Sequence, residues 1–415
     1  MDCWKRKLFD RSMCRVDFDK GNIIIYDCNG TKYTYKRTEI NGHKLLVYMR
    51  HDEYMGTVYD TITGYISPNM PKLQYAYNFD ISGMNVFLKG ISHYIGKFDG
   101  KTGYYFIKRD GFNVLFYKPP YSNTIIPKTR LLPEASTLVK NIIYNNIDSD
   151  VIKNIEEMVN DGYIPIFEVW GETLDKYNLV YGGSDVKTVK EIEGIDVDPV
   201  IELIALRIND GCDYPFIPPG EMIKIAKEYG LKTPPYEIAP VTFKKIREYY
   251  NKLNKIYEDY GRIVYEGIVV HVYDPEIGYG MFKLKPQFVL LKDVILKNIE
   301  NAEEYLNKVN YEVSKILLDY DIRYIIYEGY QEVINQIKEY LSEDVKPPVL
   351  YKLLDLAEYE LHTRITKMVV EEYPEICKEI PIKFKELKQK GYKMSKYQKT
   401  LINRIMGKCR EKEIL

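Results

Sequence analysis

The chain has 415 residues, carries 59 Lys and Arg against 60 Asp and Glu, and is 45% hydrophobic. This length favours two to four domains over a single core. No apolar run approaches the ~20 residues of a membrane span, and the charged start MDCWKRKLFD lacks the apolar core of a secretory signal. The six cysteines form no C-x-x-C pair, which predicts neither a zinc site nor a disulfide framework and favours a reducing, cytoplasmic setting.

Charge is unevenly distributed along the chain. From Cys377 to Leu415 there are twelve Lys and Arg against four Asp and Glu, a net charge of +8, so the remainder carries −9. A basic tail on an acidic body is typical of a surface that binds anions, and it is equally typical of a solvated helical face. The charge pattern alone leaves both interpretations open.

The first part of the chain has the pattern of β-structure. Residues 14–66 are expected to be β-rich, and NIIIYDCNGTKYTYKR, which starts at Asn22, predicts two short strands around an Asn-Gly turn. Residues 94–118 predict further strands broken by Asp-Gly turns.

A mixed region follows. It contains a predicted helix near residues 150–160, the β-like segment YIPIFEVWGE, and predicted helices at GEMIKIAKEYG and around residues 241–258. The segments RIVYEGIVVHVYD and YGMFKLKP predict a pair of strands. Beyond Pro286 the pattern becomes helical.

One of these later helices has a heptad pattern. Apolar residues recur with alternating spacings of four and three over residues 295–316. Such a stripe faces either the core of its own chain or a helix of a second subunit. The apolar positions are Ile295, Ile299, Ala302, Leu306, Val309, Val313 and Ile316.

The pattern Lys-x-Asp-Gly occurs twice, at Lys97 and at Lys108. Asp-Gly between strands is first of all a hairpin turn, because a type I′ turn needs a positive φ at both central residues. Three later segments follow these lysines in order: FEVWGE at 167–172, YEGIVV at 265–270 and FKLKP at 282–286. Each segment is a weak signal alone, and their order and spacing carry the information.

With these motifs the chain resembles the covalent nucleotidyltransferases, the superfamily of DNA ligases, RNA ligases and mRNA capping enzymes. Within that superfamily it is most similar to the archaeal ATP-dependent RNA ligases, whose signature Lys-x-Asp-Gly-(Tyr/Phe)-Asn-Val matches KRDGFNV from Lys108. Lys97 has no Asn at the matching place. We therefore interpret Asp99-Gly100 as a plain hairpin turn that leads into the strand ending at Lys108.

The resemblance implies an α+β fold. Its core would be the antiparallel β-sheet of a ligase-type nucleotidyltransferase with flanking helices, covering residues 67–290. A β-rich N-terminal domain would occupy 1–66, a helical dimerisation region 291–345, and a helical basic C-terminal domain 346–415.

The implied activity is ATP-dependent joining of RNA ends that bear a 5′-phosphate and a 3′-hydroxyl, joining within one strand included. It would proceed through lysyl-AMP and RNA-adenylate intermediates, which is nucleophilic catalysis that splits a difficult step into easier ones. The implied cofactors are ATP and Mg²⁺, and the implied assembly is a homodimer.

The resemblance also implies roles in the reaction with phosphate. Lys108 would be the nucleophile, with Lys283 and Lys285 placing positive charge beside it on one face of a strand. That charge would disfavour the protonated form of Lys108 and stabilise the transition state. Glu266 would be the carboxylate of the metal site.

Further residues would bind the nucleoside. Glu168 would hold the ribose hydroxyls, Arg130 would contact ribose or phosphate, Asn113 would serve the RNA-joining steps, and Val269 would pack on adenine. Trp170 is expected in the core.

The chain departs from the family pattern in three places. Phe106-Ile107 stand where a base-reading Glu is usual, so backbone atoms would have to recognise the base. Thr-Arg-Leu-Leu replaces Thr-Arg-Gly-Gly around Arg130, and Glu172 is a second candidate for the role of Glu168.

The sequence leaves alternative functions, each with features that argue for or against it. A DNA ligase would usually carry Arg after Lys-x-Asp-Gly, where Phe112-Asn113 stand, and would append an OB domain with an Arg-x-Asp-Lys element, which is absent after Pro286. The same absence argues against a capping guanylyltransferase, while another lysyl-nucleotide transferase stays an alternative. A non-catalytic nucleic-acid-binding protein is disfavoured because all the expected lysines and glutamates are present.

Overall fold

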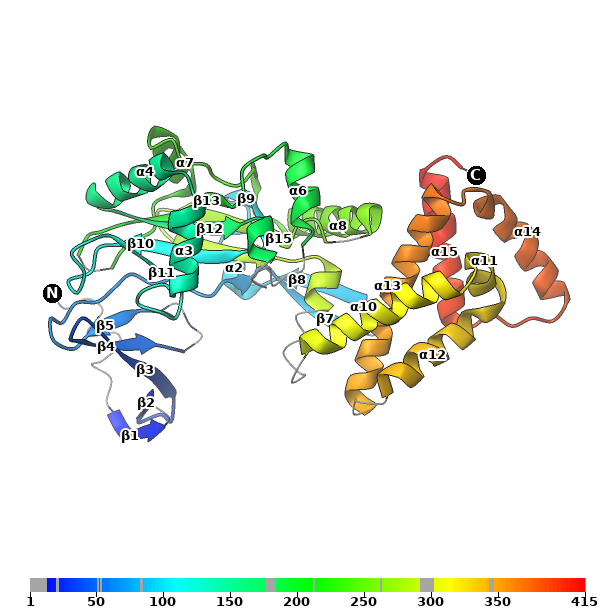
Figure 1. Cartoon of the computed structure of the whole chain (residues 1–415), viewed down its shortest axis with the longest axis horizontal. Helices are drawn as coiled ribbons and strands as arrows, with labels where there is room; N and C mark the ends of the chain where they lie inside the picture. The colour runs from blue at the N-terminus through cyan, green and yellow to red at the C-terminus, as the bar shows by residue number, and fades with distance from the viewer. Residues whose placement is uncertain are drawn as a thin grey trace. The chain divides into compact units, whose positions relative to one another are not determined.

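The computed structural model describes residues 13–19, 22–50, 52, 54–82, 85–175, 184–211, 213–261, 263–291, 302–342 and 347–414 (Figure 1). The chain divides into two units that are interleaved along the sequence. The first comprises Met1–Tyr77, Ile91–Ile246 and Tyr265–Leu284, and the second comprises Asn78–Gly90, Arg247–Val264 and Lys285–Leu415. Within the described ranges, no helix combines the length and the apolar character that a bilayer span requires.

The first unit begins with a five-stranded antiparallel sheet, as expected for a β-rich N-terminal region. The Asn-Gly turn joins its second and third strands, which confirms the predicted hairpin. The strands, in spatial order, are β1 (Met13–Asp19), β2 (Asn22–Asp27), β3 (Lys32–Ile40), β4 (His43–Tyr48) and β5 (Val58–Asp60).

Two central sheets follow in the same unit. The first central sheet has the order β11-β10-β12-β13, and the second central sheet has the order β14-β9-β15-β16-β6. All neighbours are antiparallel except β16 and β6, which are parallel. The strands of the first are β10 (Phe112–Tyr117), β11 (Ile126–Lys128), β12 (Tyr163–Trp170) and β13 (Val200–Ile208); those of the second are β6 (Gln74–Tyr75), β9 (Thr102–Lys108), β14 (Tyr236–Pro240), β15 (Gly267–Asp274) and β16 (Gly278–Leu284).

The two faces of the first central sheet are both covered. Successive side chains of a strand point to opposite faces, so Val114 packs with the helices of one core while Leu115 packs against the N-terminal sheet in another. Both residues are fully buried. The N-terminal sheet therefore shares a core with the central sheet, which fixes the strands that carry the site. The covering helices are α3 (Thr137–Asn146), α4 (Ser149–Asn160) and α7 (Pro219–Glu228).

The Asp110-Gly111 step connects the two central sheets and does not form a hairpin. It follows β9 of the second central sheet and precedes β10 of the first. A Cβ atom on Gly111 would lie 2.0 Å from the Val169 carbonyl oxygen, so only glycine allows this close approach. The hairpin interpretation of Asp99-Gly100 is also wrong, because these residues follow a helical turn, α2 (His93–Gly96), although the strand does end at Lys108 as predicted.

The second unit contains a two-stranded sheet, most of one long helix of the middle region, and the C-terminal helices. The helical structure expected beyond Pro286 is confirmed for residues 302–342 and 347–414. The elements are β7 (Tyr77–Ser82), β8 (Asn85–Ile91), α8 (Phe243–Tyr260), α10 (Ala302–Asp319), α11 (Ile322–Tyr324), the π-helical η1 (Ile325–Gly329), α12 (Tyr330–Ser342), α13 (Pro347–Glu371), α14 (Glu375–Gln389) and α15 (Lys396–Glu411). The first unit also contains two short helices, α5 (Glu172–Asp175) and α6 (Val186–Glu193).

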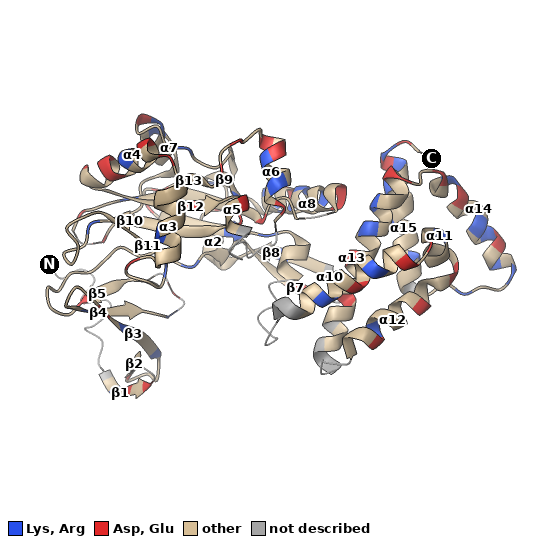
Figure 2. Cartoon of the chain, viewed as in Figure 1, with Lys and Arg blue, Asp and Glu red and all other residues tan. Residues whose placement is uncertain are grey.

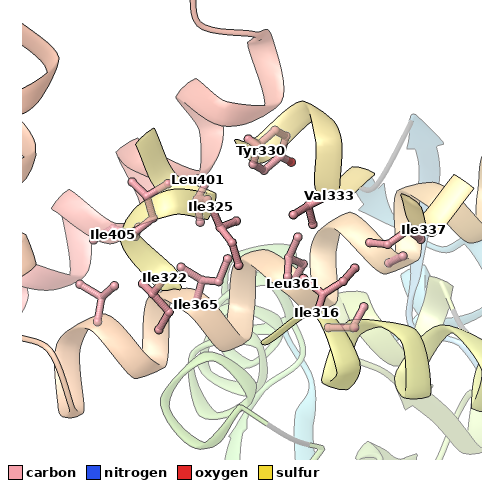
Figure 3. Close-up of a cluster of buried hydrophobic side chains, with 14 of the residues drawn as sticks. Ile316, Ile322, Ile325, Tyr330, Val333, Ile337, Leu361, Ile365, Leu401 and Ile405 are labelled. Atoms are coloured by element: carbon pink, nitrogen blue, oxygen red, sulfur yellow. The ribbon is translucent and has the colours of Figure 1, made fainter. Parts of the chain in front are cut away.

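The described half of the heptad stripe packs within its own chain. Leu306, Val309, Val313 and Ile316 are buried in a cluster formed with α12, α13 and α15, and Figure 3 shows Ile316 among the side chains of this cluster. The prediction that this stripe is a seam between subunits is therefore wrong for these residues, because their neighbours are helices of the same chain. Ile295 and Ile299 lie outside the described residues, and the homodimer stays a prediction.

The cysteines correct a second expectation. Cys14 is paired with Cys28, and Cys377 is paired with Cys409. The sequence spacing of 14 and 32 residues gave no local motif, so the prediction of no disulfide framework is wrong. Cys3 and Cys212 lie outside the described residues.

The predicted fold class is confirmed at the level of a mixed α and β protein with antiparallel sheets and helices. The predicted domain boundaries stay a prediction.

Candidate active site

Lys108 is the last residue of β9 and lies beside the start of β15. The register pairs Lys108 with Gly267, so Glu266 immediately precedes the paired residue. The Lys108 Nζ forms an ion pair with Glu266 and donates a hydrogen bond to the Arg109 carbonyl oxygen at 3.3 Å. The two charged side chains are only 20% and 10% exposed. Strand pairing thus brings an amine and a carboxylate that are 158 residues apart into one partly buried site.

Asn113 and Glu168 lie on neighbouring strands of the other central sheet. The register pairs them directly across β10 and β12, and the Asn113 amide donates a hydrogen bond to the Glu168 carboxylate. Arg130 approaches from the segment after β11: its Nη2 donates to Asn113 Oδ1 at 3.4 Å, and its Nε donates to the Met70 carbonyl oxygen at 3.1 Å. These contacts fix three of the predicted ribose- and phosphate-binding side chains in one connected group.

Burial changes the acid–base behaviour of this group. It raises the pKa of Glu168 to about 7, and the carboxylates of Glu266 and Asp110 add to the rise while Lys108 and Arg130 oppose it. Burial also lowers the pKa of Arg130. The site therefore holds carboxylates that repel one another and whose negative charge a bound cation would stabilise.

One pocket joins the two sets of side chains. Lys108, Asn113, Arg130, Glu168 and Val269 all line it. Its volume is about 70 Å³, below the roughly 300 Å³ at which ligand pockets begin. A nucleotide would require side chains at its mouth to move apart. The rest of the wall is mostly apolar and includes Phe106, Ile107, Ile204, Pro234 and Met281.

Lys283 and Lys285, the two lysines predicted to act at the phosphate, lie in different places. Lys283 is on β16, paired with Val269, and its Nζ lies 4.3 Å from the centroid of the Tyr75 ring. It does not line the pocket. Lys285 directly follows the end of β16 at Leu284 and is therefore not part of that strand; it is buried and belongs to the second unit. Their predicted roles at the phosphate stay predictions.

The remaining candidates separate clearly. Lys97 is exposed, follows α2 and does not line the pocket, in contrast to Lys108. Glu172 is also outside the pocket, where its side chain is 49% exposed and meets Lys190 at 3.3 Å. Trp170 is buried in the core as expected, and its Nε1 donates to Glu202 at 2.9 Å.

No sequence pattern indicated the buried group around Arg109, the residue between the lysine and the aspartate of the motif. Its guanidinium donates two hydrogen bonds to Glu193 of α6, at 2.7 and 2.6 Å, and two to Glu202 of β13, at 2.8 and 3.1 Å. It also stacks over Trp170, with its central carbon 4.4 Å from the ring centroid. Arg109 lines the pocket next to Lys108 and fixes the end of β9.

A second buried residue without a sequence signal is His271 of β15. It lines the pocket and its Nδ1 lies 2.7 Å from the Tyr279 hydroxyl oxygen. Burial lowers its pKa to about 3, so the imidazole is neutral at physiological pH.

The donor set fits a divalent cation that shares its coordination with phosphate. Among the described residues no group of three or more His, Cys, Asp and Glu side chains could enclose a metal ion. Mg²⁺ usually needs only one or two carboxylates together with substrate phosphates and water. Glu266, whose charge is close enough to raise the pKa of Glu168, provides that minimum.

Comparisons with known proteins give structural neighbours alone, because no family model and no curated protein matches the chain. An archaeal ATP-dependent RNA ligase is 13% identical, with 91% of this chain and 92% of that chain covered and a TM-score of 0.43. A putative ATP-dependent DNA ligase from Aquifex aeolicus is 14% identical, with 81% and 77% covered and a TM-score of 0.44. A mutant RNA ligase of Naegleria gruberi, solved with ATP and Mn, is 12% identical, with 68% and 96% covered and a TM-score of 0.34. These likenesses are low, and the inference of function rests instead on the residues of the pocket.

Proposed function

We propose that the chain is an ATP-dependent polynucleotide ligase that works through a lysyl-adenylate on Lys108, with RNA as its substrate. The observation that supports this most is the convergence of Lys108, Glu168, Asn113 and Arg130 on one pocket from two different sheets. These are the residues that the ordered motifs single out. A structural role alone would not require a partly buried lysine, a carboxylate and an arginine around the same space.

The proposed reaction has three steps. In the first, the unprotonated Lys108 Nζ attacks the α-phosphorus of ATP, a P–N bond forms, and the P–O bond to pyrophosphate breaks. In the second, an oxygen of the RNA 5′-phosphate attacks the same phosphorus, and the lysine leaves. In the third, the 3′-hydroxyl oxygen attacks the phosphorus of the 5′ end, a phosphodiester forms, and AMP leaves.

The side chains of the pocket have separate tasks in this scheme. Glu266 holds the Lys108 amine in place and is positioned to receive its proton. Glu168 and Asn113 present hydrogen-bonding groups for the ribose, and Arg130 provides a positive charge for phosphate. Phe106, Ile107 and Val269 form the apolar wall against which a base would lie. Mg²⁺ held by Glu266 and the triphosphate would supply additional positive charge to the reacting phosphate.

The central test is covalent labelling with α-labelled ATP and Mg²⁺. Lys108→Ala is expected to abolish the labelled protein band, whereas Lys97→Ala keeps most of it, because Lys97 is exposed and lies outside the pocket. Peptide mapping of the label to Lys97, or undiminished labelling of Lys108→Ala, would contradict the proposal.

The substrate needs its own experiment. Matched RNA and DNA strands with a 5′-phosphate and a 3′-hydroxyl are incubated with the adenylylated protein. Preferential sealing of RNA supports the proposed substrate, and preferential sealing of DNA assigns the chain to DNA ligation. Circles and linear products separate on a denaturing gel, which shows whether ends of one strand are joined.

Two further proposals concern the setting of the enzyme. We propose a homodimer, for which sedimentation at micromolar concentration is the test, and a monomer is the contrary result. We also propose a cytoplasmic location. The two disulfides are compatible with this location, because disulfides occur in the intracellular proteins of hyperthermophiles.

A further inference from the structure

A large cavity lies in the second unit, and none of the proposed catalytic residues lines it. It has a volume of about 900 Å³, within the range of pockets that bind small molecules. Its walls come mainly from α8, α13 and α15. Tyr257 of α8 donates to Glu360 of α13 at 2.7 Å, and Lys408 of α15 binds Asp259 at 2.7 Å. These contacts hold the three helices around the opening, so the cavity is a feature of the folded unit.

One face of α15 is reserved for this cavity. The lining residues of the helix are Tyr397, Thr400, Arg404, Lys408 and Glu411, spaced three or four residues apart, which places them on one side. The other side packs into the hydrophobic core through a separate stripe of fully buried residues: Leu401, Ile405 and Cys409. The core therefore accounts for one side of the helix, while the aromatic and basic side faces the cavity.

The cavity contains hydrogen-bonding groups of both senses. Arg404 stands over the Tyr359 ring, 5.0 Å from its centroid, and its Nη2 is buried and makes no hydrogen bond among the described residues. The nearest acid, Glu258, is 3.6 Å away. On α13, burial raises the pKa of Asp355 and raises that of Glu358 to about 7, with the carboxylate of Asp355 adding to the latter. A ligand with both acceptors and donors would match these groups.

Flat rings and amides complete the lining. Phe87 and Tyr397 are 54% and 49% exposed, which leaves ring faces available at the cavity. Asn251 adds an exposed amide and Lys255 an exposed cation. Aromatic faces stack on nucleobases, amides and carboxyls bond to base edges, and cations bind phosphate. A polyamine would match the four carboxyls of the lining, Glu258, Asp355, Glu358 and Glu411, and would be opposed by its three cations, Lys255, Arg404 and Lys408. The polyamine is therefore the alternative occupant that the test must distinguish.

We propose that this cavity binds an unpaired nucleotide of a single nucleic-acid strand, as a second binding site that shares no lining residue with the catalytic pocket. Its use in positioning a strand for joining rests on the proposed ligase function. The binding itself does not require that function, because it needs no reaction with ATP.

The test measures binding without chemistry. A fluorescent RNA hexamer that lacks a 5′-phosphate and carries a 3′-deoxy end is titrated with the full chain, and anisotropy is recorded. Thr400→Trp fills the cavity from an exposed position of α15, and Tyr397→Ala removes a stacking face. Each is expected to weaken binding about tenfold, as loss of one base–aromatic stack does.

Tyr351→Ala is the matched control. Tyr351 lies on α13 of the second unit, where it is 62% exposed, and it does not line the cavity. Its substitution should leave RNA affinity unchanged. Far-UV circular dichroism and self-adenylylation of all three variants should equal those of the unchanged chain, which separates loss of the site from loss of the fold.

The outcomes divide cleanly. Equal RNA affinity for the unchanged chain, Thr400→Trp and Tyr397→Ala overturns the proposal, and so does equal weakening by Tyr351→Ala. Binding of spermidine to the unchanged chain but not to Thr400→Trp, with equal RNA affinity for both, assigns the cavity to a polyamine instead. If self-adenylylation is absent from the unchanged chain while Thr400→Trp still weakens RNA binding, the ligase function fails and this site stands.

Discussion

The guanidinium of Arg109 connects the nucleophile to a strand and a helix that are far away in the sequence. Glu193 and Glu202 lie 84 and 93 residues along the chain from it. Burial lowers the pKa of Arg109, but the hydrogen bonds with both carboxylates outweigh this and raise it overall. Arg109 is thus a charged positioning residue, and no local pattern in KRDG could have predicted its partners.

Substitution of Arg109 is expected to cost much of the stability of the unit. Arg109→Met leaves Glu202 buried and unpaired, and breaking such a pair costs about 3–5 kcal/mol. Urea unfolding followed by tryptophan fluorescence measures this loss. The double variant Arg109→Met/Glu202→Gln is the control, because removal of the orphaned charge should restore part of the stability; a double variant that is less stable than Arg109→Met would contradict the assignment.

Glu168 predicts a pH dependence of stability. Its pKa is about 7 in the folded protein against an ordinary value of 4.5, so between these values the folded state keeps a proton that the unfolded state has lost. Stability from this group is present below pH 4.5 and is lost as the pH rises through 7, a change on the order of 3 kcal/mol. Glu168→Gln cannot ionise and should not show this loss.

The measurement is the free energy of unfolding of both proteins from pH 4 to pH 8. The unchanged chain should fall relative to Glu168→Gln as the pH rises. Parallel curves would show that Glu168 ionises with an ordinary pKa in the folded state.

At the scale of elements, local patterns predicted strands well and their partners poorly. The paired strands β15 and β16 follow from alternating residues around a tight turn, and the end of β9 at Lys108 follows from its apolar run. The assignment of β9 and β10 to different sheets could not be predicted. An Asp-Gly turn such as Asp110-Gly111 indicates that the chain changes direction, but it does not indicate which strands pair with each other. Glu266 meets Lys108 only through this long-range pairing.

The heptad pattern of α10 likewise predicted a buried face but not the helices that cover it. Its spacing correctly places Val309 and Val313 on a buried face, but the same spacing serves a subunit seam and a core helix equally. Only the neighbours α12 and α13 decide between them. The cysteine pairs were missed for a related reason, since disulfide partners need spatial proximity and not a short motif.

The disulfide between α14 and α15 should stabilise the helical unit. Cys377 and Cys409 are fully buried and enclose a loop of 32 residues, for which loop closure predicts about 3–4 kcal/mol. The double variant Cys377→Ala/Cys409→Ala should therefore melt at a lower temperature than the unchanged chain without reductant. With reductant after partial unfolding the two should converge. Equal melting temperatures in the oxidised state would show that the pair contributes nothing.

At the scale of the whole molecule, the basic C-terminal segment is both core and surface. Buried residues of α14 and α15, such as Ile380 and Leu401, belong to the hydrophobic cluster of the helical unit, while Figure 2 shows Lys and Arg along both helices. Removal of the chain after Ile376 would destroy that cluster. Point substitutions of exposed lysines are the cleaner test of an electrostatic role.

The exposed lysines of α14 and the turn after it are expected to contribute to RNA binding through phosphate. The triple variant Lys385→Gln/Lys388→Gln/Lys390→Gln removes three exposed charges without touching the core. Each lost phosphate contact should reduce the slope of log affinity against log salt by about 0.7 for a single strand. The slope is measured with the same hexamer between about 50 and 200 mM salt. An unchanged slope would show that these lysines face solvent and do not contact phosphate.

The interleaving of the two units limits how this protein could have been assembled and how it can be divided. The polypeptide passes from one unit to the other at 77–78, 90–91, 246–247, 264–265 and 284–285. A gene fragment that ends after Leu284 would encode all the strands of the first unit. It would also encode β7, β8 and most of α8, which belong to the second unit, without the C-terminal helices of that unit. The second unit therefore cannot be separated from the first by one cut in the chain. We expect split or swapped versions of this chain to fold only when Asn78–Gly90, Arg247–Val264 and Lys285–Leu415 are supplied together.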